Sequence, residues 1–195
     1  QRQMCIRDSN SGSKFLVCDK EHQLAGEKIR DQLTETDLVA VDFSEDGWCD
    51  LQSDIKVAEG DDKNPHVSAD TPFLLVYTSG TTGHPKGAIL TQEAIAINAL
   101  NGIHLADMNG QDHILTSLPM FHVGGLNIQT VPAFYVGATV TLHRRFDAAS
   151  VLRDLQELQI TLLVLVPATI QALIKLSNWN RASFSSLKTV LVGSS

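Results

Sequence analysis

Short apolar runs alternate with longer mixed stretches along this chain, and this alternation predicts strands that alternate with helices. Runs of three to five apolar residues are typical of strands, whereas apolar residues spaced three and four apart indicate helices with one buried face. Strands are expected over 15–18, 38–43, 73–76, 88–90, 114–116, 140–142, 162–166 and 189–192. Helices are expected over 20–33, 92–106, 125–136, 148–158 and 168–176, with a shorter one near 51–58. The order strand, helix, strand between residues 15 and 43 predicts parallel pairing, so the expected fold class is α/β with layered sheets flanked by helices.

Two polar residues are placed to begin helices. Thr91 is expected to cap the helix at 92–106. Asp147 is expected to cap the helix whose apolar face carries Val151, Leu152, Leu155 and Leu158. The run 73–76 is expected to be a buried strand.

Composition narrows the class of protein. The chain has 195 residues, 43% of them hydrophobic, which permits one domain with its own core. Its net charge of −7 disfavours nucleic acid or an anionic membrane as a partner. No apolar run approaches the roughly 20 residues of a membrane span. Cys18 and Cys49 have no metal-site or disulfide spacing, which favours a reducing, cytoplasmic compartment. The oligomeric state is left open.

Both ends of the chain look unlike the ends of a complete domain. Residues 1–9 read like a translated adapter from DNA library preparation; the alternative is a native polar terminus, and both are expected to be unstructured. The last residues follow a predicted strand directly. We therefore expect residues 10–195 to form part of a domain within a longer protein.

The segment Tyr77-Thr78-Ser79-Gly80-Thr81-Thr82-Gly83-His84-Pro85-Lys86-Gly87 carries the clearest chemistry. Glycines let backbone N–H groups approach an anion, hydroxyls donate hydrogen bonds, and a lysine adds positive charge, so the segment predicts a phosphate-binding loop. It is not a Walker A loop, because Pro85 stands where that motif needs glycine and Gly87 follows Lys86 where it needs Ser or Thr. The alternative is a surface turn rich in Thr and Gly.

This loop resembles the signature of the adenylate-forming (AMP-binding) superfamily, which includes acyl-CoA synthetases, luciferases and peptide-synthetase adenylation domains. The stretch Leu118-Pro119-Met120-Phe121-His122-Val123-Gly124-Gly125-Leu126 resembles the next motif of the same family, and 137–147 a third. The likeness covers residues 72–195. It implies that residues 10–195 are part of the large N-terminal domain of such an enzyme, with the C-terminal domain missing.

The resemblance also implies roles for individual residues. Thr78, Ser79, Gly80, Thr81, Thr82 and Gly83 would hold the phosphates of ATP, and Thr78 would be a candidate Mg²⁺ ligand. Lys86 would stabilise departing pyrophosphate and His122 would border the acyl and nucleotide sites, both as catalytic residues. Gly193 and Ser194 would begin a loop that contacts the adenine or the acyl group.

Three of these positions keep a structural alternative. His122 is either a site residue or a satisfied structural histidine. Gly124 and Gly125 either let a substrate approach the backbone or allow tight helix packing. His104, His113 and His143 have no metal-site spacing and are expected to be structural or exposed.

The resemblance implies activation of a carboxylic acid, a fatty acid by first preference, to an acyl-adenylate and then to a thioester. ATP, Mg²⁺ and coenzyme A would be required, and the chain alone is expected to be inactive. The alternatives are an aryl-acid or o-succinylbenzoate–CoA ligase, a peptide-synthetase adenylation domain, and a non-catalytic nucleotide-binding remnant.

Overall fold

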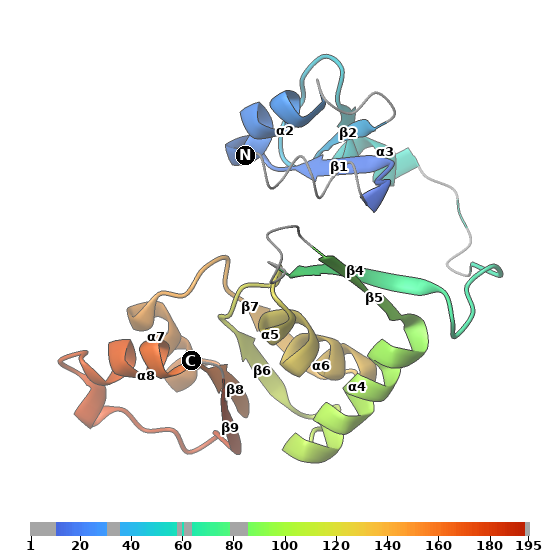
Figure 1. The fold of residues 1–195 in the computed structure, drawn as a ribbon. Coiled ribbons are helices and arrows are strands. Elements are labelled where there is room, and N and C mark those ends of the chain that lie inside the picture. The colour runs from blue at the N-terminus through green and yellow to red at the C-terminus, as the bar shows by residue number, and fades with distance from the viewer. Residues whose placement is uncertain (1–10, 31–35, 58–59, 61–63, 79–85, 194–195) are drawn as a thin grey trace. The chain divides into compact units, whose positions relative to one another are not determined.

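The computed structural model describes residues 11–30, 36–57, 60, 64–78 and 86–193. The chain divides into two units, Gln1–Gln92 and Glu93–Ser195, which are described separately (Figure 1). Both contain strands and helices, so the expected α/β class is confirmed.

The first unit begins with a small parallel sheet. Strands β1 (Phe15–Cys18), β2 (Asp37–Ala40) and β3 (Cys49–Asp50) pair in that order, and both pairings are parallel. The connection between β1 and β2 contains η1 (Lys20–His22) and α2 (Gln23–Arg30), so the predicted strand–helix–strand unit is confirmed. Helix α3 (Leu51–Val57) follows β3. The two-residue strand β3 was not predicted, because so short a strand has no periodicity.

An antiparallel hairpin completes the first unit. Strands β4 (Pro72–Thr78) and β5 (Lys86–Thr91) pair with each other alone among the described strands. Both strands were expected, but the expected burial of 73–76 is wrong: Phe73 is 46% and Leu75 40% exposed. An isolated two-stranded ribbon leaves both faces uncovered, and periodicity alone does not reveal what covers an apolar strand.

The second unit is built on a four-stranded parallel sheet with the order β7-β6-β8-β9. The strands are β6 (His113–Thr116), β7 (Thr139–Leu142), β8 (Leu162–Leu165) and β9 (Thr189–Val192), within two residues of their predicted bounds. All four residues of β8 are buried, as expected for a central strand covered on both faces.

Helices cover both faces of this sheet (Figure 1). The described helical segments of this unit are α4 (Gln92–Ala106), α5 (Val123–Gly125), the π-helical turn η2 (Leu126–Thr130), α6 (Val131–Val136), α7 (Ala148–Glu157), α8 (Pro167–Ile174) and η3 (Trp179–Arg181). Successive strand residues point to opposite faces. Leu115, Leu163 and Leu165 therefore pack in one core with residues of α7 and α8, and Ile114, Leu162 and Val164 pack in a second core with residues of α4 and α6.

Helix α7 shows how closely the sequence specifies one element. Asp147 caps it as predicted, since its carboxylate accepts a hydrogen bond from the backbone N–H of Ser150 at 2.8 Å. Val151, Leu152 and Leu155 are buried on its apolar face as predicted. The expected place of Leu158 on that face is wrong, because Leu158 lies at the C-cap, where the helix ends, and is 38% exposed. Thr91 directly precedes α4 and is the last residue of β5.

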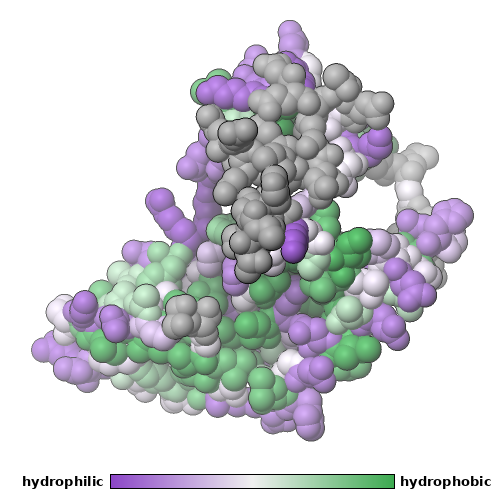
Figure 2. All heavy atoms as spheres, in the orientation of Figure 1, coloured by the Kyte–Doolittle hydropathy of each residue, from purple (hydrophilic) through white to green (hydrophobic). Residues whose placement is uncertain are grey.

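Large apolar side chains remain exposed in both units, and Figure 2 shows broad hydrophobic areas on the face it draws. They include Phe15 and Ile89 in the first unit, and Leu105, Phe121 and Phe134 in the second.

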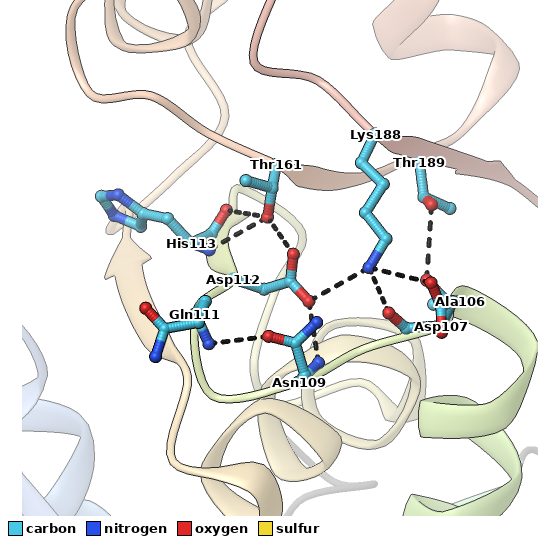
Figure 3. Close-up of polar contacts among 9 residues, drawn as sticks. All are labelled: Ala106, Asp107, Asn109, Gln111, Asp112, His113, Thr161, Lys188 and Thr189. Atoms are coloured by element: carbon cyan, nitrogen blue, oxygen red, sulfur yellow. Dashed lines mark hydrogen bonds and ion pairs between the residues drawn. The ribbon is translucent and has the colours of Figure 1, made fainter.

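A buried carboxylate joins the amino ends of three strands in the second unit (Figure 3). Oδ1 of Asp112 accepts from the Thr161 hydroxyl and Oδ2 from the Asn109 backbone N–H, both at 2.8 Å. Nζ of Lys188 lies 3.5 Å from Oδ2 and also donates to the carbonyl of Asp107. Because Asp112, Thr161 and Lys188 precede β6, β8 and β9 in turn, this network fixes the sheet at the edge where these strands begin.

The histidines that the sequence assigns to structure lie as expected. His143 Nε2 is 2.6 Å from Asp154 Oδ2, with both side chains largely buried. His113 Nε2 is 2.8 Å from the Thr141 hydroxyl, and His104 is exposed on α4.

Candidate active site

A cavity of about 410 Å³ lies at the opposite edge of the second unit's sheet, where the strands end. Its described lining comes from α4, the segment after β6, α5, η2, β8, β9 and the residues that follow: Leu105, Leu118, Pro119, His122, Gly124, Gly125, Ile128, Val164, Val166, Leu191, Val192 and Gly193. The chain leaves β6 to form β7 on one side and then β8 on the other. In open α/β sheets, ligands bind outside the carboxyl ends of strands at such a reversal of strand order.

The cavity brings together several residues that the sequence singles out. His122, Gly124, Gly125 and Gly193 all line it, although Gly193 lies 68 positions after Gly125. The catalytic and binding roles expected of these residues stay predictions. Ser194 lies outside the described residues.

His122 is held in place by its own helix. Its backbone is extended, with φ −111° and ψ 142°, and its Nδ1 accepts a hydrogen bond from the backbone N–H of Gly124 at 3.1 Å. An accepting Nδ1 carries no proton, so the neutral ring carries its proton on Nε2. The structure therefore gives His122 a capping contact and also a place on the cavity wall, while its role as a site residue stays a prediction.

The two adjacent glycines differ in what surrounds them. A Cβ atom on Gly125 would lie 2.4 Å from the carbonyl oxygen of Pro119 and 2.6 Å from that of Leu118. Only glycine allows this close approach of two backbone segments, so tight packing explains Gly125. A Cβ on Gly124 would meet the ring of His122 alone among the described residues within 4 Å, with Nδ1 at 3.3 Å. The constraint at Gly124 is therefore weaker than at Gly125, because the neighbour is a side-chain ring and not the backbone.

In the first unit, the structure places the two residues that bracket the predicted phosphate loop. Thr78 ends β4, Lys86 begins β5, and the two are register partners. The Thr78 hydroxyl donates to the Lys86 carbonyl at 3.5 Å, and both residues are exposed. Ser79, Gly80, Thr81, Thr82 and Gly83 lie outside the described residues. The hairpin thus brings the two residues that flank the predicted phosphate loop side by side, and the role of the loop stays a prediction.

Sequence reasoning missed a polar interior beside the cavity. Thr130 Oγ1 lies 2.9 Å from Thr116 Oγ1 and 2.7 Å from the Gly125 carbonyl oxygen, which it reaches as a donor across the turn η2. Gln129 is fully buried, and neither of its amide atoms has a hydrogen-bond partner among the described residues. The available signal was the polar residues at 127, 129 and 130 within an otherwise apolar helix. π-Helical turns occur frequently at functional sites.

The apolar lining residues were also missed. Leu105, Val164 and Leu191 belong to segments that were predicted, but in the sequence they are indistinguishable from core residues. Their place at the cavity follows from strand order, which the sequence does not reveal.

The described part of the chain lacks two further features. Its His, Cys, Asp and Glu residues form no group of three suited to a metal ion. None of its helices has both the length and the apolar character needed to cross a membrane.

Comparison with known proteins agrees with this architecture. The family model for "AMP-binding enzyme" matches residues 1–195. Indoleacetate–CoA ligase of Aromatoleum aromaticum is 46% identical over 168 residues, which are 85% of this chain and 33% of that protein. Feruloyl-CoA synthase of an Amycolatopsis species is 38% identical over 135 residues, which are 68% of this chain and 28% of that protein. The chain therefore spans about a third of the length of these relatives.

A solved structure shows the same fold. The inhibitor-bound N-terminal domain of FACL13 from Mycobacterium tuberculosis matches with a TM-score of 0.87 at 26% identity, over 100% of this chain and 48% of that one. The expected correspondence to an N-terminal domain of adenylate-forming enzymes is thus confirmed for the fold.

Proposed function

Since this chain belongs to the AMP-binding enzyme family, we propose that it supplies the phosphate-binding loop and part of the acyl site of an ATP-dependent acid–CoA ligase. In this reaction a carboxylate oxygen attacks the α-phosphorus of ATP and pyrophosphate leaves. The thiol of coenzyme A then attacks the acyl carbon of the adenylate and AMP leaves. Residues 10–195 act as one part of a longer N-terminal domain, and the isolated chain is inactive.

Positioning and charge neutralisation are the main tasks of the protein in such a transfer. Thr78 and Lys86, side by side at the end of the hairpin, hold the loop of Ser79 to Gly83 from both ends. Hydroxyls and backbone N–H groups of the loop bind phosphate oxygens. Lys86 carries a positive charge that stabilises pyrophosphate as it departs. This interaction strengthens in the transition state, because negative charge grows on the leaving pyrophosphate there.

We propose that Mg²⁺ binds here mainly through the phosphates of the nucleotide, with few protein ligands. The described residues offer no cluster of acidic ligands, and Mg²⁺ commonly binds through substrate phosphates, water and one or two protein oxygens. Thr78 is the protein ligand we propose, because among the described residues its exposed hydroxyl makes only a long hydrogen bond, 3.5 Å to the Lys86 carbonyl. When bound, the ion neutralises phosphate charge.

The acid is proposed to be aromatic or arylalkyl, rather than the fatty acid that the sequence alone favoured. The cavity supports an uncharged acyl group, because its described lining is apolar apart from His122 and holds no charged side chain. Its volume of about 410 Å³ is typical of small-molecule sites. The choice of an aromatic acid over a fatty acid rests on the relatives. The relatives named above act on indoleacetate and form feruloyl-CoA, which are both aromatic. A second charge on the acid would be buried without a partner, so dicarboxylic acids are disfavoured.

The compartment is proposed to be the cytoplasm. Cys18 is buried and Cys49 is exposed, and both are free thiols, as expected under reducing conditions.

The experiment is a substrate panel with the full-length enzyme, ATP, Mg²⁺ and coenzyme A. AMP and thioester are measured with indoleacetate, ferulate, palmitate and malonate. We expect kcat/KM to be highest for an aromatic acid and lowest for malonate. A preference for palmitate would reinstate the fatty acid. Acid-dependent pyrophosphate exchange without thioester would point to a carrier-protein acceptor, and the absence of any acid-dependent reaction would overturn the ligase proposal.

A further inference from the structure

The helical segment beside the cavity contains a proline at a position where its backbone needs an N–H group. In the π-helical turn η2, Val131 donates its backbone N–H to the carbonyl of Leu126, five positions back. By the same spacing, the carbonyl of Asn127 would pair with the N–H of residue 132. That residue is the fully buried Pro132, which has no N–H. The π-helical pattern therefore offers the Asn127 carbonyl no backbone donor.

A side chain of α4, which lies beside this segment (Figure 1), supplies the donor. Nδ2 of Asn98 lies 2.8 Å from the carbonyl oxygen of Asn127 and donates to it. Asn127 is buried, so an unpaired carbonyl there would be costly. The two segments also approach closely at Gly102, where a Cβ would lie 3.1 Å from Cγ of Pro132 and 3.5 Å from the carbonyl oxygen of Ile128. The bond from Asn98 is thus made where α4 and η2 pack together.

We infer that Asn98 is a positioning residue for acid binding, because its amide replaces the N–H that Pro132 lacks and keeps η2 in its π-helical form. This rests on the proposed acid–CoA ligase function and deepens it. Ile128 of η2 lines the cavity, whereas Asn98 is not among the described lining residues. Because π-helical and α-helical bonding differ by one residue, a turn that loses this bond can change register and move Ile128.

The first test compares Asn98→Ala with wild type in the full-length enzyme, using whichever acid of the panel above the wild type activates best. We expect KM for the acid to rise by about 10-fold, because one neutral hydrogen bond is worth up to about that factor. The turnover number and KM for ATP should change little. Asn98→Asp should lose as much, since a carboxylate of the same size has no N–H to donate. Asn101→Ala, at an exposed position of α4, is the matched control and should behave like wild type.

A second test restores the missing donor. In Pro132→Ala the backbone regains an N–H at position 132, which can donate to the Asn127 carbonyl. Most of the loss caused by Asn98→Ala should therefore disappear when Pro132→Ala is already present. A side chain that only fills space would cost the same in both backgrounds.

Amide hydrogen exchange gives a readout besides activity. Exchange of the backbone amides in residues 123–136 should become faster in Asn98→Ala and stay unchanged in Asn101→Ala, because only the first variant releases η2. Unchanged exchange in Asn98→Ala would show that the turn does not depend on this bond.

The possible results separate the two proposals. A wild type that activates no acid would overturn the proposed function, and the positioning role with it. An active wild type whose KM for the acid is unchanged by Asn98→Ala would overturn the role of Asn98 alone. Equal losses with and without Pro132→Ala would also overturn it. If Pro132→Ala does not fold, Asn98→Asp decides, because wild-type behaviour of that variant contradicts the inference and a loss equal to that of Asn98→Ala supports it.

Discussion

Nζ of Lys188 lies 3.5 Å from Oδ2 of Asp112, although the two residues are 76 positions apart in the sequence. Burial alone raises the pKa of Asp112, but hydrogen bonds from Asn109 and Thr161 and the charge of Lys188 outweigh it and hold the pKa below its ordinary value. The carboxylate is therefore charged in the folded protein and ties together the strands that begin beside it.

Asp112→Ala should destabilise the chain by about 1–3 kcal/mol, because the Thr161 hydroxyl and the Asn109 N–H lose their acceptor in a buried place. Chemical denaturation measures the change. Because the folded pKa is depressed, the stabilisation is fully present above the unfolded pKa of about 4 and is lost as the pH falls through the folded pKa. The difference between wild type and variant should therefore shrink below about pH 4. A difference that stays constant down to pH 2 would contradict this assignment.

Leu152→Ala should destabilise by about 2–5 kcal/mol, because Leu152 is 1% exposed and packs in the core beneath α7. Leu158→Ala, at the end of the same helix and 38% exposed, is the matched control and should lose only a fraction of that. Thermal unfolding of both variants provides the comparison. Equal losses would show that this core is not where the structure places it.

Gln129→Met should raise stability by about 1 kcal/mol, because a buried amide without a partner is replaced by an apolar chain of similar length. Gln156→Met, on the exposed face of α7, is the control and should change little. The measurement is again the free energy of unfolding. A clear loss at 129 would mean that the amide is hydrogen-bonded in solution, for example to a buried water molecule.

Lys86→Ala in the full-length enzyme should slow acid-dependent pyrophosphate exchange by about 100-fold or more in kcat, with less change in KM for the acid. The reason is that its charge is proposed to act on pyrophosphate as it leaves. Lys175→Ala, which removes another lysine at the end of α8, should behave like wild type. Unchanged exchange in the Lys86 variant would remove this residue from the mechanism.

Many of the helices and strands could be predicted from the pattern of neighbouring residues. Features that depend on how strands pair or on helix geometry could not be predicted in this way. Apolar runs at 15–18 and 189–192 predict strands whose bounds agree with the structure, and Asp147 predicts the start of α7. The pairing of β4 with β5 was not predicted, because the same apolar run suits a buried parallel strand and an exposed antiparallel ribbon. The π-helical turn at 126–130 was missed because its sequence continues a helical pattern.

The candidate site was predictable where its residues carry unusual chemistry. Lys86 and His122 stand out as functional groups beside glycines. Gly124 stands out in the sequence as well, but its difference from Gly125 depends on distances to the Pro119 carbonyl and the His122 ring, which exist only in the folded chain.

The position of β6 between β7 and β8 has a consequence for synthesis. Of the four strands of this sheet, β6 leaves the ribosome first, and its partner on one side, β8, follows only after β7 and α7 have been made. Until then one edge of β6 is unpaired and Leu115 lacks β8 as a neighbour, a state in which strands tend to associate with other chains. The cavity is also completed late in synthesis, because its lining residues run from Leu105, before β6, to Gly193, after β9. Slow translation between β7 and β8 should therefore increase the dependence of this protein on chaperones.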